Sequence, residues 1–260
     1  MALRSADEAI ELDALLADGY SSRGIITAQI GGNIDAAEAD FARANELAPN
    51  NPNAAIWSIR VLAQRGESRQ GYTEAQRAVG PNPFHAGRRM SVVGLAFLLD
   101  DYDVVIDEAR AAADLAPGLS LATSYEGRAL ALTGQGTACL ARELGVYDLV
   151  RAICLHTAGR EAEAAQLAKE AGLALSSSGM SDTYHMDDMA IQDLASYYGL
   201  VGDAPNATLW LRRAFDLSPT GIDFWTLNSE LFDAVRSDVD FADAVVEVDR
   251  EAIAKVAALR

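Results

Sequence analysis

Histidines and closely spaced carboxylates are the residues of this sequence that could bind a metal ion. The three histidines, His85, His156 and His185, lie far apart in the sequence, and none belongs to an H-E-x-x-H pair. Two zinc ligands on one helical face need a spacing of about four residues. The histidine spacing therefore argues against a zinc site, and we expect no metal centre.

An acidic run, LLDDYDVV, places Asp100, Asp101 and Asp103 close together. It resembles the DDxxD metal motif of helical terpenoid synthases, but its fifth position is Val104 and not a carboxylate. The run also falls where the other repeats of this chain, described below, have a turn between two helices. We therefore interpret these carboxylates as a solvated turn and helix cap.

A second polar run, SSSGMSDTYHMDD at 176–188, brings serine, aspartate and histidine together in the sequence. Catalytic triads are assembled by tertiary geometry, and the G-x-S-x-G turn that exposes a nucleophilic serine is absent. The run is interpreted as a linker in which Asp182 or Thr183 caps the next helix. We predict a protein that is not an enzyme and has no cofactor; an α-helical enzyme with an unrecognised site is the alternative.

Two cysteines, Cys139 and Cys154, are too few for a disulfide framework. They are interpreted as reduced side chains that fill small spaces between helices. The first residues, MALRSADEAIELD, lack the apolar region of a signal peptide, and the apolar run VVGLAFLL is far too short to span a membrane. A cytoplasmic protein is therefore expected.

The charge balance limits the classes of partner. The chain of 260 residues has 38 Asp and Glu against 21 Lys and Arg, a formal net charge of −17. Nucleic acids and anionic membranes are bound by clusters of Lys and Arg, so we expect neither as a partner. Alanine is abundant and no long run alternates between apolar and polar residues, so the composition favours helices over strands.

Prolines mark an internal repeat. Pro49, Pro83 and Pro117 are evenly spaced, and Pro219 follows after three more periods of the same length. The segments that end at these prolines share small or apolar residues twelve, eight and five positions earlier, which predicts one amphipathic helix each. We expect the small residues of this register to be buried at close helix crossings: Ala37, Ala44, Gly71, Ala78, Ala112, Ala207 and Ala214.

Another helical stretch precedes each of these segments and ends at a turn signal: Gly32, Gly66, Asp100–Asp101, Gly134, Gly159 or Gly202. The unit of helix, turn, helix and turn, with a period of about 34 residues and with Ala37, Phe41 and Pro49 in an A-x3-F…P pattern, resembles the tetratricopeptide repeat (TPR). The resemblance covers nearly the whole chain and implies an all-α, right-handed αα-superhelix of about six helical pairs. One domain is expected over 1–260, with an N-terminal helix at 1–17, repeats at 18–219 that are irregular at 135–183, and a C-terminal capping helix within 220–260.

In the TPR family, the first helix of each repeat lines a concave groove that binds proteins or peptides. The resemblance therefore implies a non-catalytic interaction or regulatory scaffold; a small-ligand or peptide sensor is a further alternative. None of the groove residues that the resemblance implies is a carboxylate. We therefore expect the Asp and Glu side chains on the convex side and the caps, with Arg60 and Arg128 exposed in the groove. Carried onto this register, the groove residues are Gln29, Arg60, Gln64, Met90, Phe97, Ser124, Arg128, His156, Met189 and Gln192.

The N-terminal end predicts an uncovered apolar face. Ser5 and Glu8 form a possible capping box before a helix whose apolar residues include Leu12 and Leu15. This helix looks like the second helix of a repeat whose first helix is missing. The closing segment, SELFDAVRSDVDFADAV, resembles the end of C-terminal TPR regions of bacterial multidomain regulators. Either the chain belongs to such a longer protein, or two copies form a homodimer through their N-terminal ends.

Overall fold

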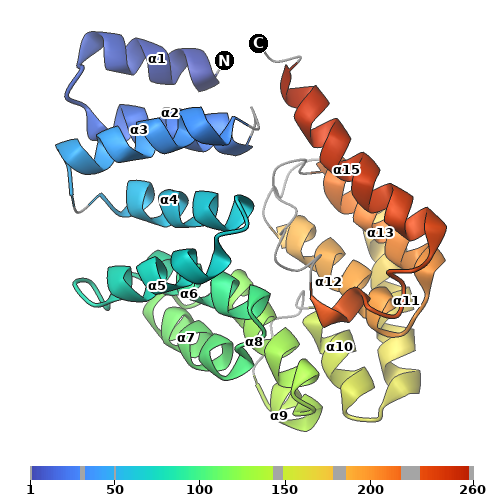
Figure 1. Ribbon diagram of the computed structural model, residues 1–260. Helices are drawn as coiled ribbons and strands as arrows, with labels where there is room; N and C mark the ends of the chain where they lie inside the picture. Colours follow the sequence, from blue (N-terminus) through green and yellow to red (C-terminus); the bar gives the residue numbers. More distant parts are fainter. Residues whose placement is uncertain are drawn as a thin grey trace. The chain divides into compact units, whose positions relative to one another are not determined.

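The computed structural model describes residues 2–29, 33–49, 51–142, 149–177, 186–217 and 229–257. All regular structure in these ranges is helical (Figure 1), which confirms the prediction of an all-α fold. The chain divides into two compact units. Unit 1 comprises residues 1–95 with 249–260, and unit 2 comprises residues 96–248.

Unit 1 consists of successive helices that pack against their neighbours in sequence (Figure 1). A first helix, α1, packs on a hairpin of α2 and α3, which is followed by a hairpin of α4 and α5. The helix α6 begins in unit 1 and ends in unit 2. Their bounds are α1 (Ala2–Leu12), α2 (Ala17–Gln29), α3 (Ile34–Leu47), α4 (Pro52–Gln64), α5 (Ser68–Val79) and α6 (Ala86–Leu98).

Unit 2 continues the same order of helical pairs, with α8 against α9, α10 against α11 and α12 against α13. The bounds are α7 (Tyr102–Leu115), α8 (Ser120–Leu132), α9 (Gly136–Leu140), α10 (Val150–Thr157), α11 (Glu161–Ser177), α12 (Met186–Leu200) and α13 (Ala204–Leu217). A short 3-10 helix, η1 (Glu230–Phe232), precedes the last helix, α15 (Val239–Ala257).

The turns inside the hairpins confirm the predicted turn signals. Gly66, Gly134, Gly159 and Gly202 have φ between 73° and 82°, and Asp100 has φ 58° at the equivalent place between α6 and α7. A left-handed residue reverses the chain immediately after a helix, and glycine adopts this conformation at least cost. Gly32, the remaining turn signal, lies outside the described residues.

Small residues allow the helices of each hairpin to approach closely, as predicted. In unit 1, a Cβ atom on Gly24 would lie 2.7 Å from the Phe41 ring, so that ring occupies the space left by the glycine. Ala37, Ala44, Gly71, Ala112, Ala207 and Ala214 are all buried. Ala78 is the exception and is only half-buried, because the second helix that carries it ends one residue later, at Val79.

The helices in the centre of the repeats differ in length. The second helix of the fourth hairpin, α9, has only 5 residues, whereas α7 and α13 at the equivalent place have 14 each. The helix α11 is longer, with 17 residues. Most of the predicted linker at 176–184 lies outside the described residues.

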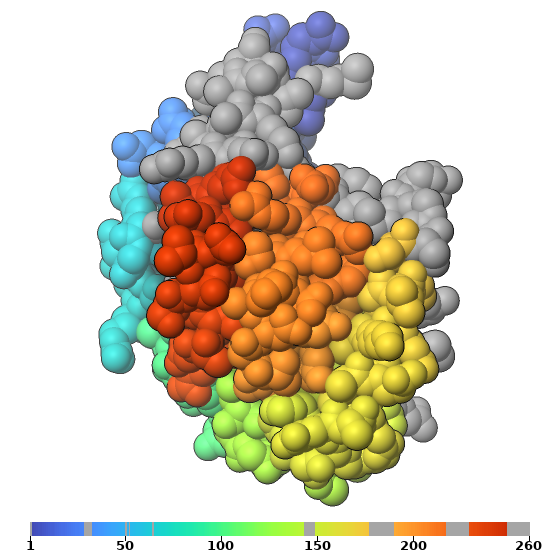
Figure 2. All heavy atoms as spheres, turned by 90° about the vertical axis from the view of Figure 1, so that its right-hand side faces the viewer, coloured from blue at the N-terminus to red at the C-terminus, as the bar shows by residue number. Residues whose placement is uncertain are grey.

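The C-terminal cap packs on the last hairpin. The aromatic rings of Phe232 and Phe241 are buried and stack on each other with centroids 5.4 Å apart. Phe232 fills the space beside Gly199 of α12, where a Cβ atom would lie 2.5 Å from the ring. In Figure 2 the atoms of α13 and α15 lie side by side, in agreement with an ion pair between Arg212 and Glu247.

The N-terminal helix begins earlier than the capping box predicts. It starts at Ala2, so Ser5 lies inside the helix and does not cap it, and Glu8 pairs with Arg4. Ala6 of α1 is buried, but Leu12 and Leu15 at the end of α1 and in the following turn are 90% and 70% exposed.

Candidate functional site

In unit 1, the predicted groove residues Arg60 and Met90 are half-buried on the first helices α4 and α6. The Arg60 guanidinium lies over the Trp57 ring, with its carbon 4.7 Å from the ring centroid. Trp57 in turn packs against the buried core of Phe41 and Val61. A cation held over an indole ring has fewer orientations to lose when it binds an anionic group.

The helices α4 and α6 contact each other at Ile56 and Gly87. The Cδ1 atom of Ile56 lies 3.2 Å from the position of a Cβ atom on Gly87. Arg60 and Met90 follow Ile56 and Gly87 by four and three residues, so they lie one helical turn further along these faces. Together these side chains form a surface, here called the α4–α6 surface, of Ile56, Arg60, Gly87 and Met90.

The α4–α6 surface differs in charge from the rest of the chain. The sequences of α4 and α6 contain three arginines and no carboxylate, although the whole chain has a net charge of −17. Two of these arginines bind backbone carbonyls, with Arg88 donating to that of Ala78 near the end of α5 and Arg89 to that of Pro83 in the following turn. The guanidinium of the third arginine, Arg60, lies over the Trp57 ring.

In unit 2 the expected exposure of Arg128 is wrong. Its side chain is 0% exposed and forms an ion pair with Asp193, whose side chain is 2% exposed. Ser124 is also buried, and its hydroxyl donates to the same carboxylate at 2.9 Å. The first helices α8 and α12 contact each other directly, so these polar side chains lie in an interior and not on a groove wall.

Asp193 is the centre of this buried cluster. Its Oδ1 atom accepts hydrogen bonds from Arg128 Nε at 3.0 Å and from an Arg128 terminal nitrogen at 2.8 Å. Its Oδ2 atom accepts from the backbone N–H of Val150 at 3.1 Å. Val150 is the first residue of α10, and the N-terminal end of a helix stabilises a negative charge through its free N–H groups and its dipole. One carboxylate therefore joins α8, α10 and α12.

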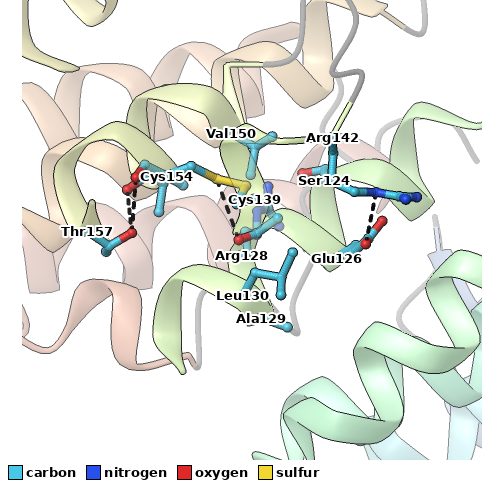
Figure 3. The surroundings of a disulfide bond; sticks show 12 residues. Ser124, Glu126, Arg128, Ala129, Leu130, Cys139, Arg142, Val150, Cys154 and Thr157 are labelled. Carbon is cyan, nitrogen blue, oxygen red and sulfur yellow. Dashed lines mark hydrogen bonds and ion pairs between the residues drawn. A yellow bond between two sulfur atoms is a disulfide. The ribbon is translucent and has the colours of Figure 1, made fainter. Parts of the chain in front are cut away.

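A second buried carboxylate, Glu126, also contradicts the expectation that the acids lie on the convex side and the caps. It lies on the first helix α8, and its Oε1 atom pairs with Arg110 at 2.7 Å and with Arg142 at 3.1 Å. Figure 3 shows the pair with Arg142. The side chains of the two arginines are 43% and 44% exposed, so the carboxylate is buried beneath them.

The remaining predicted groove residues of unit 2 are dispersed. Phe97 is buried and packs edge-on against Tyr102 and Tyr125, with centroids 5.7 and 5.1 Å away. His156 is half-buried, and its ring lies edge-on to Tyr197 at 6.3 Å. Gln192 is buried on α12. The side chains of Gln29, Gln64 and Met189 lie outside the described part of the structure.

The two cysteines also differ from the expectation. Cys139 of α9 and Cys154 of α10 are joined by a disulfide bond, with a Cα–Cα distance of 5.9 Å (Figure 3). Both are fully buried, so they do occupy small spaces between helices, but as a covalent link and not as separate thiols. The sequence spacing of 15 residues gave no sign of the pairing, because it depends on where α9 meets α10.

Sequence reasoning missed Asp193 altogether. The available signal was its context, AIQDLASYY, in which an acid stands among apolar residues on a helix. Its neighbours Ile191, Leu194 and Ala195 are buried. A buried carboxylate requires a partner, so such a position predicts a buried cation or several N–H and O–H donors.

No three His, Cys, Asp or Glu side chains come together as a potential metal site within the described ranges. In the same part of the chain, no helix has the length and apolar character needed to cross a membrane.

Neither a protein-family model nor a curated protein matches this sequence. Similar folds occur among solved structures. A tetratricopeptide repeat protein from Parabacteroides merdae is similar over 90% of each chain, with 13% identity and a TM-score of 0.56. A TPR protein of Thermus thermophilus, TTC0263, is similar over 88% of this chain and 99% of its own, with 17% identity and a TM-score of 0.51. For pilF of Pseudomonas aeruginosa the shares are 94% and 99%, with 15% identity and a TM-score of 0.52. The helical hairpins, their left-handed turns and these similarities agree that the chain has a TPR-like fold.

Proposed function

We propose that this protein is a non-catalytic interaction scaffold that binds a protein or peptide segment along the first helices of unit 1. The observation that carries the proposal is the α4–α6 surface, where Arg60 is held over Trp57 beside the apolar Ile56 and Met90. TPR-like folds present such surfaces on first helices, and the similar solved structures support this interpretation of the fold.

The surface chemistry points to the kind of segment that is bound. Half-buried Ile56 and Met90 provide apolar contact area, and Met adapts to differently shaped partners. Arg60 provides one oriented cation on helices that contain no carboxylate. A segment with one or two acidic residues next to aliphatic residues fits this combination. Binding by Ser124 and Arg128 does not form part of this proposal, because both are buried.

Peptide binding to the full chain tests the proposal. A panel of fluorescent peptides would carry Glu next to Leu or Ile, and a matched panel would carry Lys in place of Glu. We expect only the acidic panel to bind, and we expect Arg60→Glu to weaken binding about 10-fold or more, since reversal replaces an attraction by a repulsion.

The matched control is Arg77→Glu, the same charge reversal on the second helix α5, where Arg77 is 70% exposed and pairs with Glu74. We expect this variant to bind like the wild type, and circular dichroism to show both variants folded. Equal losses in the two variants would attribute the effect to net charge, and unchanged binding by Arg60→Glu would refute the α4–α6 surface as the site.

A further inference from the structure

The fourth hairpin of the fold has too little apolar surface to hold its second helix by packing alone. Of the five residues of α9, only Gly136 and Cys139 are buried. The helix α7, at the equivalent place in the preceding hairpin, buries Val105, Ile106, Ala109 and Ala112. Helices as short as α9 are unstable in isolation, so their position depends on contacts with the rest of the fold.

Two close contacts fix α9 against α10. The α9 backbone comes close to the end of α10 at Gly136. A Cβ atom there would lie 2.6 Å from the Ala158 backbone nitrogen and 2.8 Å from the Cys154 carbonyl oxygen. One turn further along α9, Cys139 meets Cys154 in the disulfide. The disulfide joins α9 to α10 covalently, and Gly136 at the beginning of α9 allows the two backbones to come close.

The same short helix α10 also completes the Asp193 cluster. The N–H of its first residue, Val150, donates to Asp193, and Cys154 lies one turn later on the helix. The Val150 side chain fills the space beside Gly127 of α8, where a Cβ atom would lie 2.6 Å from it. In Figure 3 Val150 lies beside the disulfide. The helix α10 is packed through buried Ala152, Ile153 and Leu155, and it is also joined to Asp193 at its beginning and to α9 by the disulfide near its middle.

We propose that the Cys139–Cys154 disulfide is a redox-dependent staple that replaces the missing length of the fourth hairpin's second helix and keeps Val150 in contact with Asp193. In the reduced chain, α9 separates from α10 and the Val150–Asp193 hydrogen bond opens more often. Disulfides persist in oxidising compartments, so the fully stapled form belongs to such a setting and not to the reducing cytoplasm expected from the sequence.

The bond forms from two thiols by exchange with a disulfide oxidant. One cysteine thiolate attacks the sulfur of oxidised glutathione, and one glutathione thiolate leaves. The second cysteine, as its thiolate, then attacks the mixed disulfide at the cysteine sulfur and displaces the second glutathione thiolate. The protein loses two electrons and two protons, and one oxidised glutathione becomes two reduced molecules.

Thermal unfolding and hydrogen exchange of the full chain test the staple. After equilibration with oxidised glutathione, alkylation of the unfolded chain should modify no cysteine, and after reduction it should modify both. Closing a loop of this length predicts that reduction lowers the melting temperature by about 6–12 °C. The Val150 amide should exchange about 10- to 100-fold faster after reduction, because its hydrogen bond then opens without global unfolding.

The control is the double variant C139A/C154A, in which reductant should change neither quantity. This variant should resemble the reduced wild type, and if it fails to fold, the comparison of oxidised with reduced wild type still decides. Two free thiols after incubation with oxidised glutathione would overturn the proposal. So would an intact disulfide whose reduction changes neither the melting temperature nor the Val150 exchange rate.

Discussion

Removing the Asp193 carboxylate is the most informative perturbation of this fold. The substitution Asp193→Leu keeps a side chain of similar size but leaves the fully buried guanidinium of Arg128 without its counter-charge. It also removes the acceptor for the Ser124 hydroxyl and the Val150 N–H. Breaking a buried ion pair by removing one partner costs about 3–5 kcal/mol, because the remaining charge stays desolvated. That is a large share of the roughly 5–15 kcal/mol by which domains are stable.

Removing both charges should cost much less than removing one. The double variant Arg128→Met with Asp193→Leu removes both charges of this pair, and a well-packed apolar pair is often as stable as the ion pair it replaces. The Ser124 hydroxyl and the Val150 N–H still lose their acceptor, which costs about 1–3 kcal/mol. The two single variants should therefore each unfold more easily than the double variant.

Urea unfolding followed by circular dichroism measures all three variants against the wild type. Asp216→Leu, which removes an exposed carboxylate of α13, is the control and should change the free energy of unfolding by no more than about 0.5 kcal/mol. The reasoning is refuted if Asp193→Leu costs no more than this control. It is also refuted if the double variant loses the sum of the two single losses, because the pair would then contribute no coupling.

Three further outcomes are expected. Asp100→Gly should stabilise the protein by about 0.5–1 kcal/mol in urea unfolding, because Asp100 has φ 58° where four equivalent turns have glycine; a loss of stability would show that its hydrogen bond from Tyr102 matters more. Burial raises the pKa of Tyr102, Tyr197 and Tyr198. Because the folded state then holds these phenol protons above the unfolded pKa of about 10, stability should fall as the pH rises past about 10, and Tyr102→Phe should make this decline shallower in thermal melts; an unchanged slope would contradict it. Light scattering should detect two copies associated through exposed Leu12 and a monomer for Leu12→Glu; a monomeric wild type would exclude this association.

Local regularities of the sequence determined the repeat architecture. The evenly spaced prolines, together with the turn glycines, indicated where helices end, because proline cannot continue a helix and glycine accepts a left-handed turn. The alanines and glycines of the register indicated where helices can approach, since a residue without bulk admits a neighbour such as the Ile59 backbone beside Gly71. These features act within one or two turns of the chain, so the sequence alone predicts them.

Burial in unit 2 was decided only by the tertiary structure. Ser124 and Arg128 occupy the same register as the groove residues of unit 1, yet they meet Asp193, which lies 69 and 65 residues away in sequence. The contact exists because α8 and α12 meet, and α10 presents the N–H of its first residue, Val150, to the same carboxylate of α12. The Cys139–Cys154 bond has the same origin, since it depends on how closely the five-residue α9 approaches α10. A repeat pattern states which side chains face a neighbouring helix, but the lengths and positions of the helices decide whether that face is open to a partner or closed by the fold.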